Sequence, residues 1–76
     1  MILANETQQK VFYYISCEGV QSEQGTIEVN GVADLPAFDN QTNVGVQFTP
    51  PDGVAFQIKI DDTRSGEQVE MAVVAE

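Results

Sequence analysis

The sequence predicts an all-β protein: a small single-domain sandwich or open barrel of five to six mainly antiparallel strands with a C-terminal meander. Three observations predict this fold. Apolar residues alternate with polar ones in several short runs, which is the period of a half-buried strand. Clusters containing proline, glycine or asparagine separate the runs. No stretch long enough for a helix shows the apolar spacing of three to four residues that a helix requires.

The N-terminal half supplies the less regular elements. Residues 1–9 are expected to form an extended or frayed N-terminal segment, because Asn5 and Thr7 are poor helix formers. The single β domain is expected over residues 10–76. Its first strand covers 11–15, which is rich in β-branched and aromatic residues, and a second covers 26–29. The second ends at Asn30 and Gly31, a dipeptide typical of tight hairpin turns.

The C-terminal half carries the clearest alternation. Residues 44–60 predict a hairpin whose turn is the Pro-Pro-Asp-Gly stretch at 50–53. The side chains expected on its buried face are Val44, Val46, Phe48, Val54, Phe56, Ile58 and Ile60. A third alternating run over 69–73 would complete a meander. Residues 32–43 do not alternate cleanly and contain Pro36, so a loop, a short edge strand or a single helical turn is expected there.

The charge excludes several classes of function. The chain has 76 residues, of which 12 are acidic and 3 basic, so its formal net charge is −9 at pH 7. With Lys10, Lys59 and Arg64 as its only basic side chains, it has no basic patch for nucleic acid or an anionic membrane. The start of the chain lacks the pattern of a signal peptide, and a single cysteine fits a reducing compartment, so a cytoplasmic location is expected.

The titratable residues do not indicate catalysis, so we expect no enzymatic activity and no cofactor. The chain has no histidine, and no base is placed to activate Cys17 as a nucleophile. We also expect no metal site. The carboxylates that come nearest to one are Asp61, which begins an incomplete calcium-loop pattern, and Asp34 and Asp39, which share an irregular stretch with asparagines.

Two predicted strands are apolar on both faces, which identifies a candidate interface. In residues 11–15 the rings of Phe12 and Tyr14 lie opposite the expected core side chains, and Ala72 and Val74 do the same near the C-terminus. The loop at 32–43 or another protein would cover these four residues. Tyrosine suits an interface, because its ring buries area while its hydroxyl keeps a polar partner.

We therefore expect a non-enzymatic protein–protein interaction or assembly module, which self-associates through an apolar sheet face as a homo-oligomer. Two alternatives stay open. One is an acidic inhibitor that mimics nucleic acid and occupies a basic nucleic-acid-processing protein; its recurring carboxylates are Glu18, Glu23, Glu28, Asp34 and Asp39. The other is a small ligand- or sugar-binding module with loops rich in glutamine and asparagine and a stacking platform at Tyr13, Tyr14 or a phenylalanine.

Overall fold

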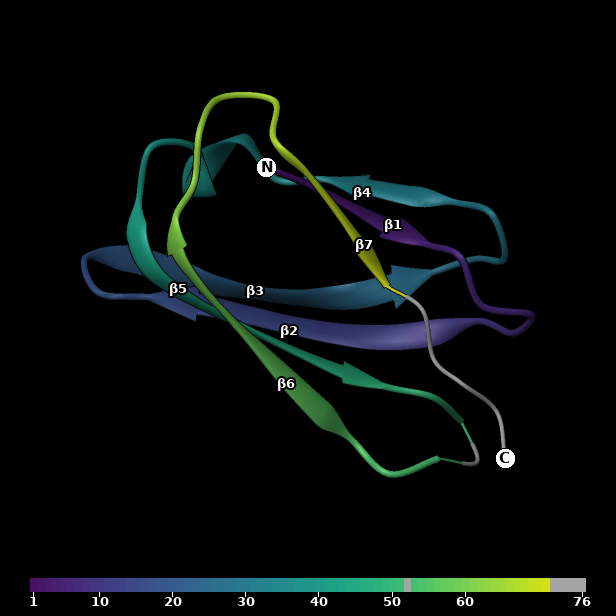
Figure 1. The fold of residues 1–76 in the computed structure, drawn as a ribbon. Helices are drawn as coiled ribbons and strands as arrows, with labels where there is room; N and C mark the ends of the chain where they lie inside the picture. The colour runs from purple at the N-terminus through teal and green to yellow at the C-terminus, as the bar shows by residue number, and fades with distance from the viewer. Residues whose placement is uncertain (52, 72–76) are drawn as a thin grey trace.

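Seven strands and one short 3-10 helix make up the described part of the chain, residues 1–51 and 53–71, in a computed structural model (Figure 1). The elements are β1 (Ile2–Asn5), β2 (Val11–Cys17), β3 (Val20–Ile27), β4 (Val32–Asp34), η1 (Pro36–Phe38), β5 (Thr42–Thr49), β6 (Phe56–Asp62) and β7 (Gln68–Met71). The all-β prediction is therefore confirmed. The described strands outnumber the five to six expected, because residues 2–5 and 32–34 each form a short strand.

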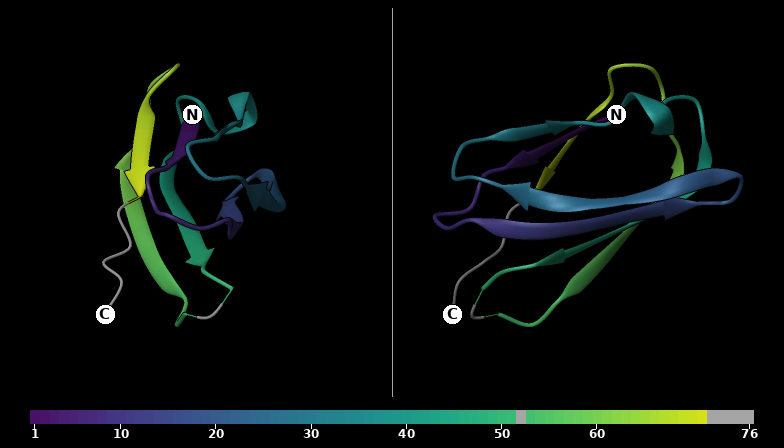
Figure 2. Two further views of the ribbon diagram at one scale, coloured as in Figure 1. Left: turned by 90° about the vertical axis from the view of Figure 1, so that its right-hand side faces the viewer. Right: turned by 180° about the vertical axis from the view of Figure 1, so that it is seen from behind.

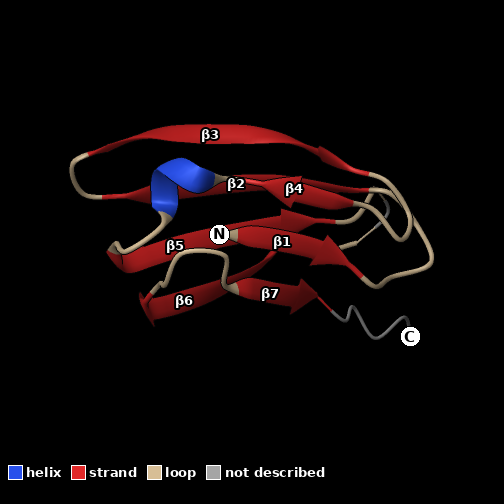
Figure 3. Ribbon diagram, turned by 90° about the horizontal axis from the view of Figure 1, so that it is seen from above, coloured by secondary structure: helices blue, strands red, loops and turns tan. Residues whose placement is uncertain are grey.

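The strands form two sheets that pack as an open sandwich. One sheet has four strands in the order β3-β2-β5-β6, and the other has three in the order β4-β1-β7. Seen from above, β4, β1 and β7 lie over the strands of the larger sheet, while β3 lies at the rim of the molecule (Figure 3). The views from the side and from behind show the same two layers (Figure 2).

The hairpin predicted over residues 44–60 is present. Strands β5 and β6 are antiparallel, and Val44, Val46 and Phe48 lie opposite Ile60, Ile58 and Phe56. The rings of Phe48 and Phe56 pack with their centroids 5.5 Å apart. Val54 differs from the prediction: it lies before β6 and is 89 % exposed.

The chain leaves the larger sheet after β6, so the predicted meander stops at two strands. The third strand, β7, pairs in parallel with β1 in the other sheet instead of lying beside β6. The alternating pattern predicts a strand here, but such a pattern does not indicate which other strand it pairs with. The backbone N–H of Thr63 donates to the Gln41 carbonyl at 2.9 Å, which extends the β5–β6 pairing by one residue. The buried hydroxyl of Thr63 anchors the start of the crossing to Phe38 and Gln41.

The N-terminal segment is extended, as expected, but it is not frayed. Strand β1 is the central strand of the smaller sheet, antiparallel to β4 and parallel to β7, and Leu3 is fully buried. The Asn30–Gly31 turn also has another role than the predicted hairpin. Asn30 adopts a positive φ of 60° and the Gly31 N–H donates to the Glu28 carbonyl, but the turn links β3 in one sheet to β4 in the other.

The core lies between the two sheets, and the stretch at 32–43 closes one end of it. This stretch forms both a short strand, β4, and a helical turn, η1. Leu35 and Phe38 from this stretch are buried with the inward side chains of β2 and β5. The stretch therefore packs into the core and does not cover the outer face of the larger sheet. Within the described residues, no helix is long and apolar enough to cross a membrane.

Candidate functional site

The outer face of the four-stranded sheet carries two aromatic side chains in the middle of two polar rows. Strand β2 buries Val11 and Ile15 completely, so the alternate side chains Phe12 and Tyr14 point away from the core. Cross-strand pairing places neutral polar residues on both sides of each ring. We call the two rows the aromatic–amide face: the first is Thr26, Phe12 and Thr49, and the second is Gln24, Tyr14, Gln47 and Gln57.

Both rings of the aromatic–amide face are open to solvent. Phe12 is 45 % exposed and Tyr14 is 44 % exposed. Two open depressions flank Tyr14. One has a volume of about 510 Å³ and includes Gln57 and Lys59 in its lining, and the other is lined by Phe12 and Gln24 among others. The face is thus contoured, with an open hollow beside each ring.

This face is depleted of the charge that dominates the rest of the chain. None of the 12 acidic residues stands in either row. The row next to Tyr14 consists of Ser16, Gly45 and Lys59, so it adds a positive charge and no carboxylate. The centre of a protein–protein contact is commonly poor in charged residues and rich in aromatic ones. In both respects the aromatic–amide face resembles such a centre.

The structure brings together part of the predicted interface. Phe12 and Tyr14 lie on one face, as the alternation in residues 11–15 predicts. Ala72 and Val74 lie outside the described residues. Strand β7, which ends at Met71 just before them, belongs to the other sheet. Among the described residues the neighbours of the two rings are therefore glutamines and threonines.

The carboxylates considered as metal ligands lie in different elements. Asp34 is in β4 and Asp61 is in β6, where it lies 3.9 Å from the Lys59 ammonium. Asp39 forms an ion pair with the Met1 amino group and accepts a 3.3 Å hydrogen bond from the Ser65 hydroxyl. No group of three His, Cys, Asp or Glu side chains with metal-binding geometry occurs in the part of the chain that the structure describes. The recurring carboxylates from Glu18 to Asp39 are likewise spread over turns, β3, β4 and a loop.

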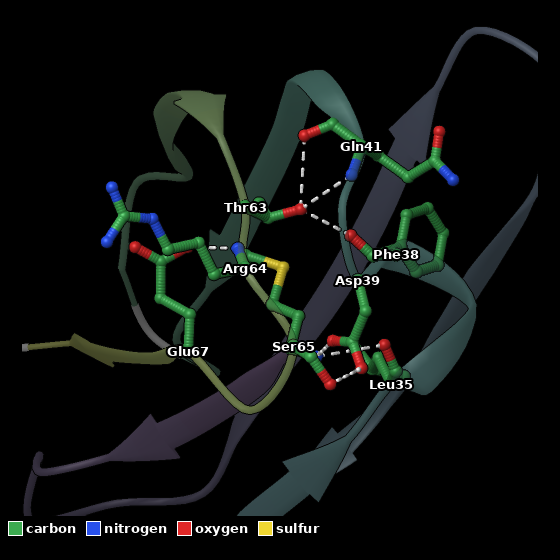
Figure 4. Close-up of polar contacts among 9 residues, drawn as sticks. Leu35, Phe38, Asp39, Gln41, Thr63, Arg64, Ser65 and Glu67 are labelled. Atoms are coloured by element: carbon green, nitrogen blue, oxygen red, sulfur yellow. Dashed lines mark hydrogen bonds and ion pairs between the residues drawn. The ribbon is translucent and has the colours of Figure 1, made fainter.

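The oxygen-rich turn after Asp61 has a structural role that its calcium-like spacing does not predict. Thr63 is fully buried, and its hydroxyl shares its single proton between the carbonyls of Phe38 and Gln41 and accepts from the Gln41 N–H at 3.0 Å (Figure 4). Its oxygen therefore points into the protein rather than toward a cation. Ser65 in the same turn points to Asp39 (Figure 4).

A second buried polar side chain, Asn5, joins the two sheets. Its amide donates to the carbonyls of Gln9, Ile27 and Glu28 at 2.9–3.2 Å. Its side-chain oxygen accepts from the N–H and the hydroxyl of Thr7. Asn5 thus satisfies backbone groups in three segments and is only 1 % exposed. Sequence reasoning missed both Asn5 and Thr63, because no local pattern distinguishes a buried polar residue from an exposed one.

Cys17 ends β2 and is half-buried. Burial raises the pKa of its thiol, so the unreactive protonated form is favoured. This direction is opposite to the one that a nucleophilic cysteine needs.

The aromatic–amide face offers apolar ring surface together with amide and hydroxyl groups that both donate and accept hydrogen bonds. These groups are suited to non-covalent recognition. Their arrangement depends on the cross-strand register, which places Gln24 and Gln47 on either side of Tyr14. Comparisons with protein-family models, curated proteins and solved structures found no significant match to this chain.

Proposed function

We propose that this chain is a non-enzymatic assembly module that associates with a second copy of itself through the aromatic–amide face. One observation carries the proposal: two half-exposed aromatic side chains lie in rows without a carboxylate, on a chain with a net charge of −9. Aromatic rings on an exposed face contribute large apolar areas when a partner covers them.

The charge distribution favours a second copy as the partner. Two identical chains repel each other over most of their surfaces, because each carries nine excess negative charges. The aromatic–amide face is a region where two copies meet without opposing carboxylates. A two-fold contact also brings the same surface of both copies together. The rings of each copy would then lie against the depressions around Tyr14 of the other copy.

The contact is expected to be weak and partly hydrated. Stable interfaces bury about 800 Å² on each partner, and the short rows of this face contain only two rings among five polar residues. Glutamine and threonine side chains keep water in such contacts, because their polar groups need hydrogen-bond partners. A reversible association that depends on concentration is the expected behaviour.

The test is sedimentation velocity of the chain over a range of protein and salt concentrations. We expect association to strengthen as salt rises, because salt screens the repulsion between two negative chains. The double variant Phe12→Ser, Tyr14→Ser is expected to weaken association at least about tenfold, since it removes both rings. The matched control is Val29→Ser, Val32→Ser, which removes two exposed apolar side chains outside the face.

Two results would contradict the proposal. The first is a wild-type chain that stays monomeric at millimolar concentration and high salt. The second is a control variant that loses as much association as the double aromatic variant. Association that weakens with salt would indicate a contact between opposite charges, which this face does not supply.

A sugar-binding role is the second candidate, and the amides around Tyr14 favour it. A ring flanked by Gln24 and Gln47 stacks on the apolar side of a sugar while the amides bond its hydroxyl groups. A thermal-shift screen of neutral oligosaccharides tests it, since a ligand that binds the folded chain raises its melting temperature. Stabilisation that is lost in Tyr14→Ser but kept in Val29→Ser would support this role.

We also infer that the protein works in a reducing, cytoplasmic setting. Cys17 is the only cysteine in the sequence and is free, as expected of a protein in a reducing compartment. Thiol labelling of the protein taken directly from its native cells tests this inference. An oxidised Cys17 in that sample would overturn it.

A further inference from the structure

The two sheets end in four edge strands among the described residues, and these edges differ in how well they are protected. Unpaired edges attract other strands, and proteins usually block them with short strands or charged side chains. Strand β4 has three residues and β7 has four. Strand β6 carries Lys59, Asp61 and Asp62. Strand β3 has eight residues and a single charged side chain, Glu23. The least protected edge is therefore β3.

The backbone of β3 is accessible along most of its length. Among residues 1–51 and 53–71 its only strand partner is β2, and Gln21 to Gln24 are all exposed. It lies at the rim of the molecule when the sandwich is seen from above (Figure 3). At its end, the Ile27 carbonyl already accepts a hydrogen bond from the Asn5 amide at 3.0 Å. The part of the edge that can accept another strand is thus Val20 to Thr26.

We propose that β3 is a pairing edge for a second copy of this chain. The two β3 strands would be antiparallel, related by a two-fold axis that passes midway between the two copies of Gln24. In an antiparallel pair, opposite residues share a face. A two-fold axis perpendicular to the sheet keeps inner faces with inner faces, and it passes midway between the two copies of one residue of β3, by which we name it. The continuous sheet formed in this way has eight strands, β3-β2-β5-β6 from each copy.

The side chains of β3 select the position of that axis. An axis through Glu23 would place two carboxylates directly opposite each other, which is unfavourable. An axis through Gln24 places the two Gln24 amides opposite each other, Glu23 opposite Gly25 and Ser22 opposite Thr26. All three pairs avoid like charges, and the amide and hydroxyl pairs can form hydrogen bonds.

Gly25 allows the two β3 strands to approach each other closely beside the axis. It has no side chain of its own, and the ring of Tyr13 lies over it, with the hydroxyl 2.9 Å from where a Cβ would be. Glu23 of the second copy therefore lies opposite a residue that has no side chain of its own. A glycine covered by an aromatic ring is a known way to keep an edge strand ordered.

This inference rests on the proposed function only in naming the same partner. The two contacts share the side chains of Gln24 and Thr26, but the edge contact is made by the backbone of β3 and the face contact by the rings of Phe12 and Tyr14. The axis of the edge contact is perpendicular to the larger sheet, whereas the axis of a face-to-face contact lies parallel to it. Perpendicular two-fold axes that meet generate a closed tetramer with D2 symmetry. In that tetramer two eight-stranded sheets pack through paired aromatic–amide faces, which doubles the area that a single face provides.

Cysteine cross-linking tests the register directly. In a Cys17→Ser background, Gln24→Cys places two sulfurs on opposite residues, whose Cα atoms are about 4.5–5.5 Å apart, within the range for a disulfide. Ser22→Cys is the matched control on the same strand and face. Its two cysteines would be four residues apart along the strands, about 13 Å, which is too far. A second control, Gln57→Cys, lies on the opposite edge strand.

We expect Gln24→Cys to form covalent dimers at least about tenfold faster than either control under mild oxidation. Equal rates for all three variants would indicate random collision and would overturn the edge contact. Faster cross-linking of Ser22→Cys than of Gln24→Cys would overturn the proposed register. The same measurement in the Phe12→Ser, Tyr14→Ser background separates the two proposals, because the edge contact is expected to persist there.

A charge variant checks the result without oxidation. Gln24→Lys places two ammonium groups opposite each other on the axis and is expected to abolish the edge contact, while it affects the face-to-face contact no more than a lysine elsewhere in the aromatic–amide face does. Gln57→Lys adds the same charge to the aromatic–amide face away from the axis, so it controls for effects on that face. If Gln57→Lys lowers the association as much as Gln24→Lys does, the edge contact is overturned. If association is lowered only by the double aromatic variant, the face contact is supported and the edge contact is overturned.

Discussion

The larger sheet consists of two hairpins of sequence neighbours, β2–β3 and β5–β6, joined by the pairing of β2 with β5, whereas the smaller sheet joins strands from the beginning, the middle and the end of the described chain. In the larger sheet, β2 pairs with β3 and β5 pairs with β6, each through a short connection. In the smaller sheet, β1 pairs with β4 and β7. Its strands have only three or four residues.

The two sheets are consequently held by different interactions. Long antiparallel strands with alternating apolar residues stabilise the larger sheet through local pairing and core burial. The smaller sheet contributes Leu3 and Met71 to the same core, but its short strands also depend on buried polar side chains that bridge distant segments. Asn5 in β1 reaches Ile27, and Thr63 before β7 reaches Phe38 and Gln41. We therefore expect the smaller sheet to open first when the protein is destabilised.

The substitution with the largest expected effect is Asn5→Ala. It removes the partner of several buried backbone groups, so we expect the free energy of unfolding to fall by about 3 kcal/mol. This is a large part of the total for so small a domain. Urea unfolding measures the loss, and Gln8→Ala, an exposed neighbour, is the control.

Hydrogen exchange shows which of the two sheets is destabilised by Asn5→Ala. Amides of β1 and β4 are expected to lose more protection than those of β2 and β5, because Asn5 lies in the smaller sheet and binds segments next to it. Equal loss of protection in both sheets would contradict the difference between them.

Thr63→Val is expected to have the next largest effect. Valine keeps the shape of threonine but leaves the Gln41 N–H and the Phe38 carbonyl without their hydroxyl partner, which costs about 2 kcal/mol. The control is Thr42→Val, at an exposed position of β5. Thermal unfolding that changes equally in both variants would show that the hydroxyl of Thr63 is not what fixes the crossing.

The same difference explains which features the sequence predicts. Alternation and turn residues locate the hairpin at 44–60, because a local pattern determines a local pair. The two exposed rings follow from the same pattern, since Phe12 and Tyr14 are two residues apart. The parallel pairing of β1 with β7 has no local cause. It results from side chains that meet only after folding, and so do the glutamines that line the aromatic–amide face.

A smaller effect is expected within the larger sheet, for Gly25→Ala. A Cβ at this position would lie 2.9 Å from the Tyr13 hydroxyl and 3.1 Å from the ring carbon that bears it, so the ring must shift, at a cost of about 1 kcal/mol. Gly45→Ala is the matched control in β5, where the nearest atom is 3.9 Å away. Unfolding of Gly25→Ala in a Tyr13→Phe background is expected to recover part of the loss. A larger loss in Gly45→Ala than in Gly25→Ala would show that ring contact is not the cause.

The smallest expected effect is a dependence of stability on pH, and it is due to Tyr13. Burial raises the pKa of Tyr13 above its usual value of 10.0, and the nearby Glu23 charge raises it further. The folded chain thus binds this proton more tightly than the unfolded chain does. Its contribution to stability is complete below about pH 10 and is lost as the pH rises through the folded-state pKa.

Urea unfolding above about pH 10 measures this dependence. Tyr13→Phe is expected to remove it, and Glu23→Gln to reduce it, because the charge is the second cause of the raised pKa. Ultraviolet titration of a Tyr14→Phe variant reports Tyr13 alone, since the chain has two tyrosines. If Tyr13 in that variant titrates at or below its usual pKa, its ring is not desolvated over β3. The covering of Gly25, on which the edge contact depends, would then be absent in solution.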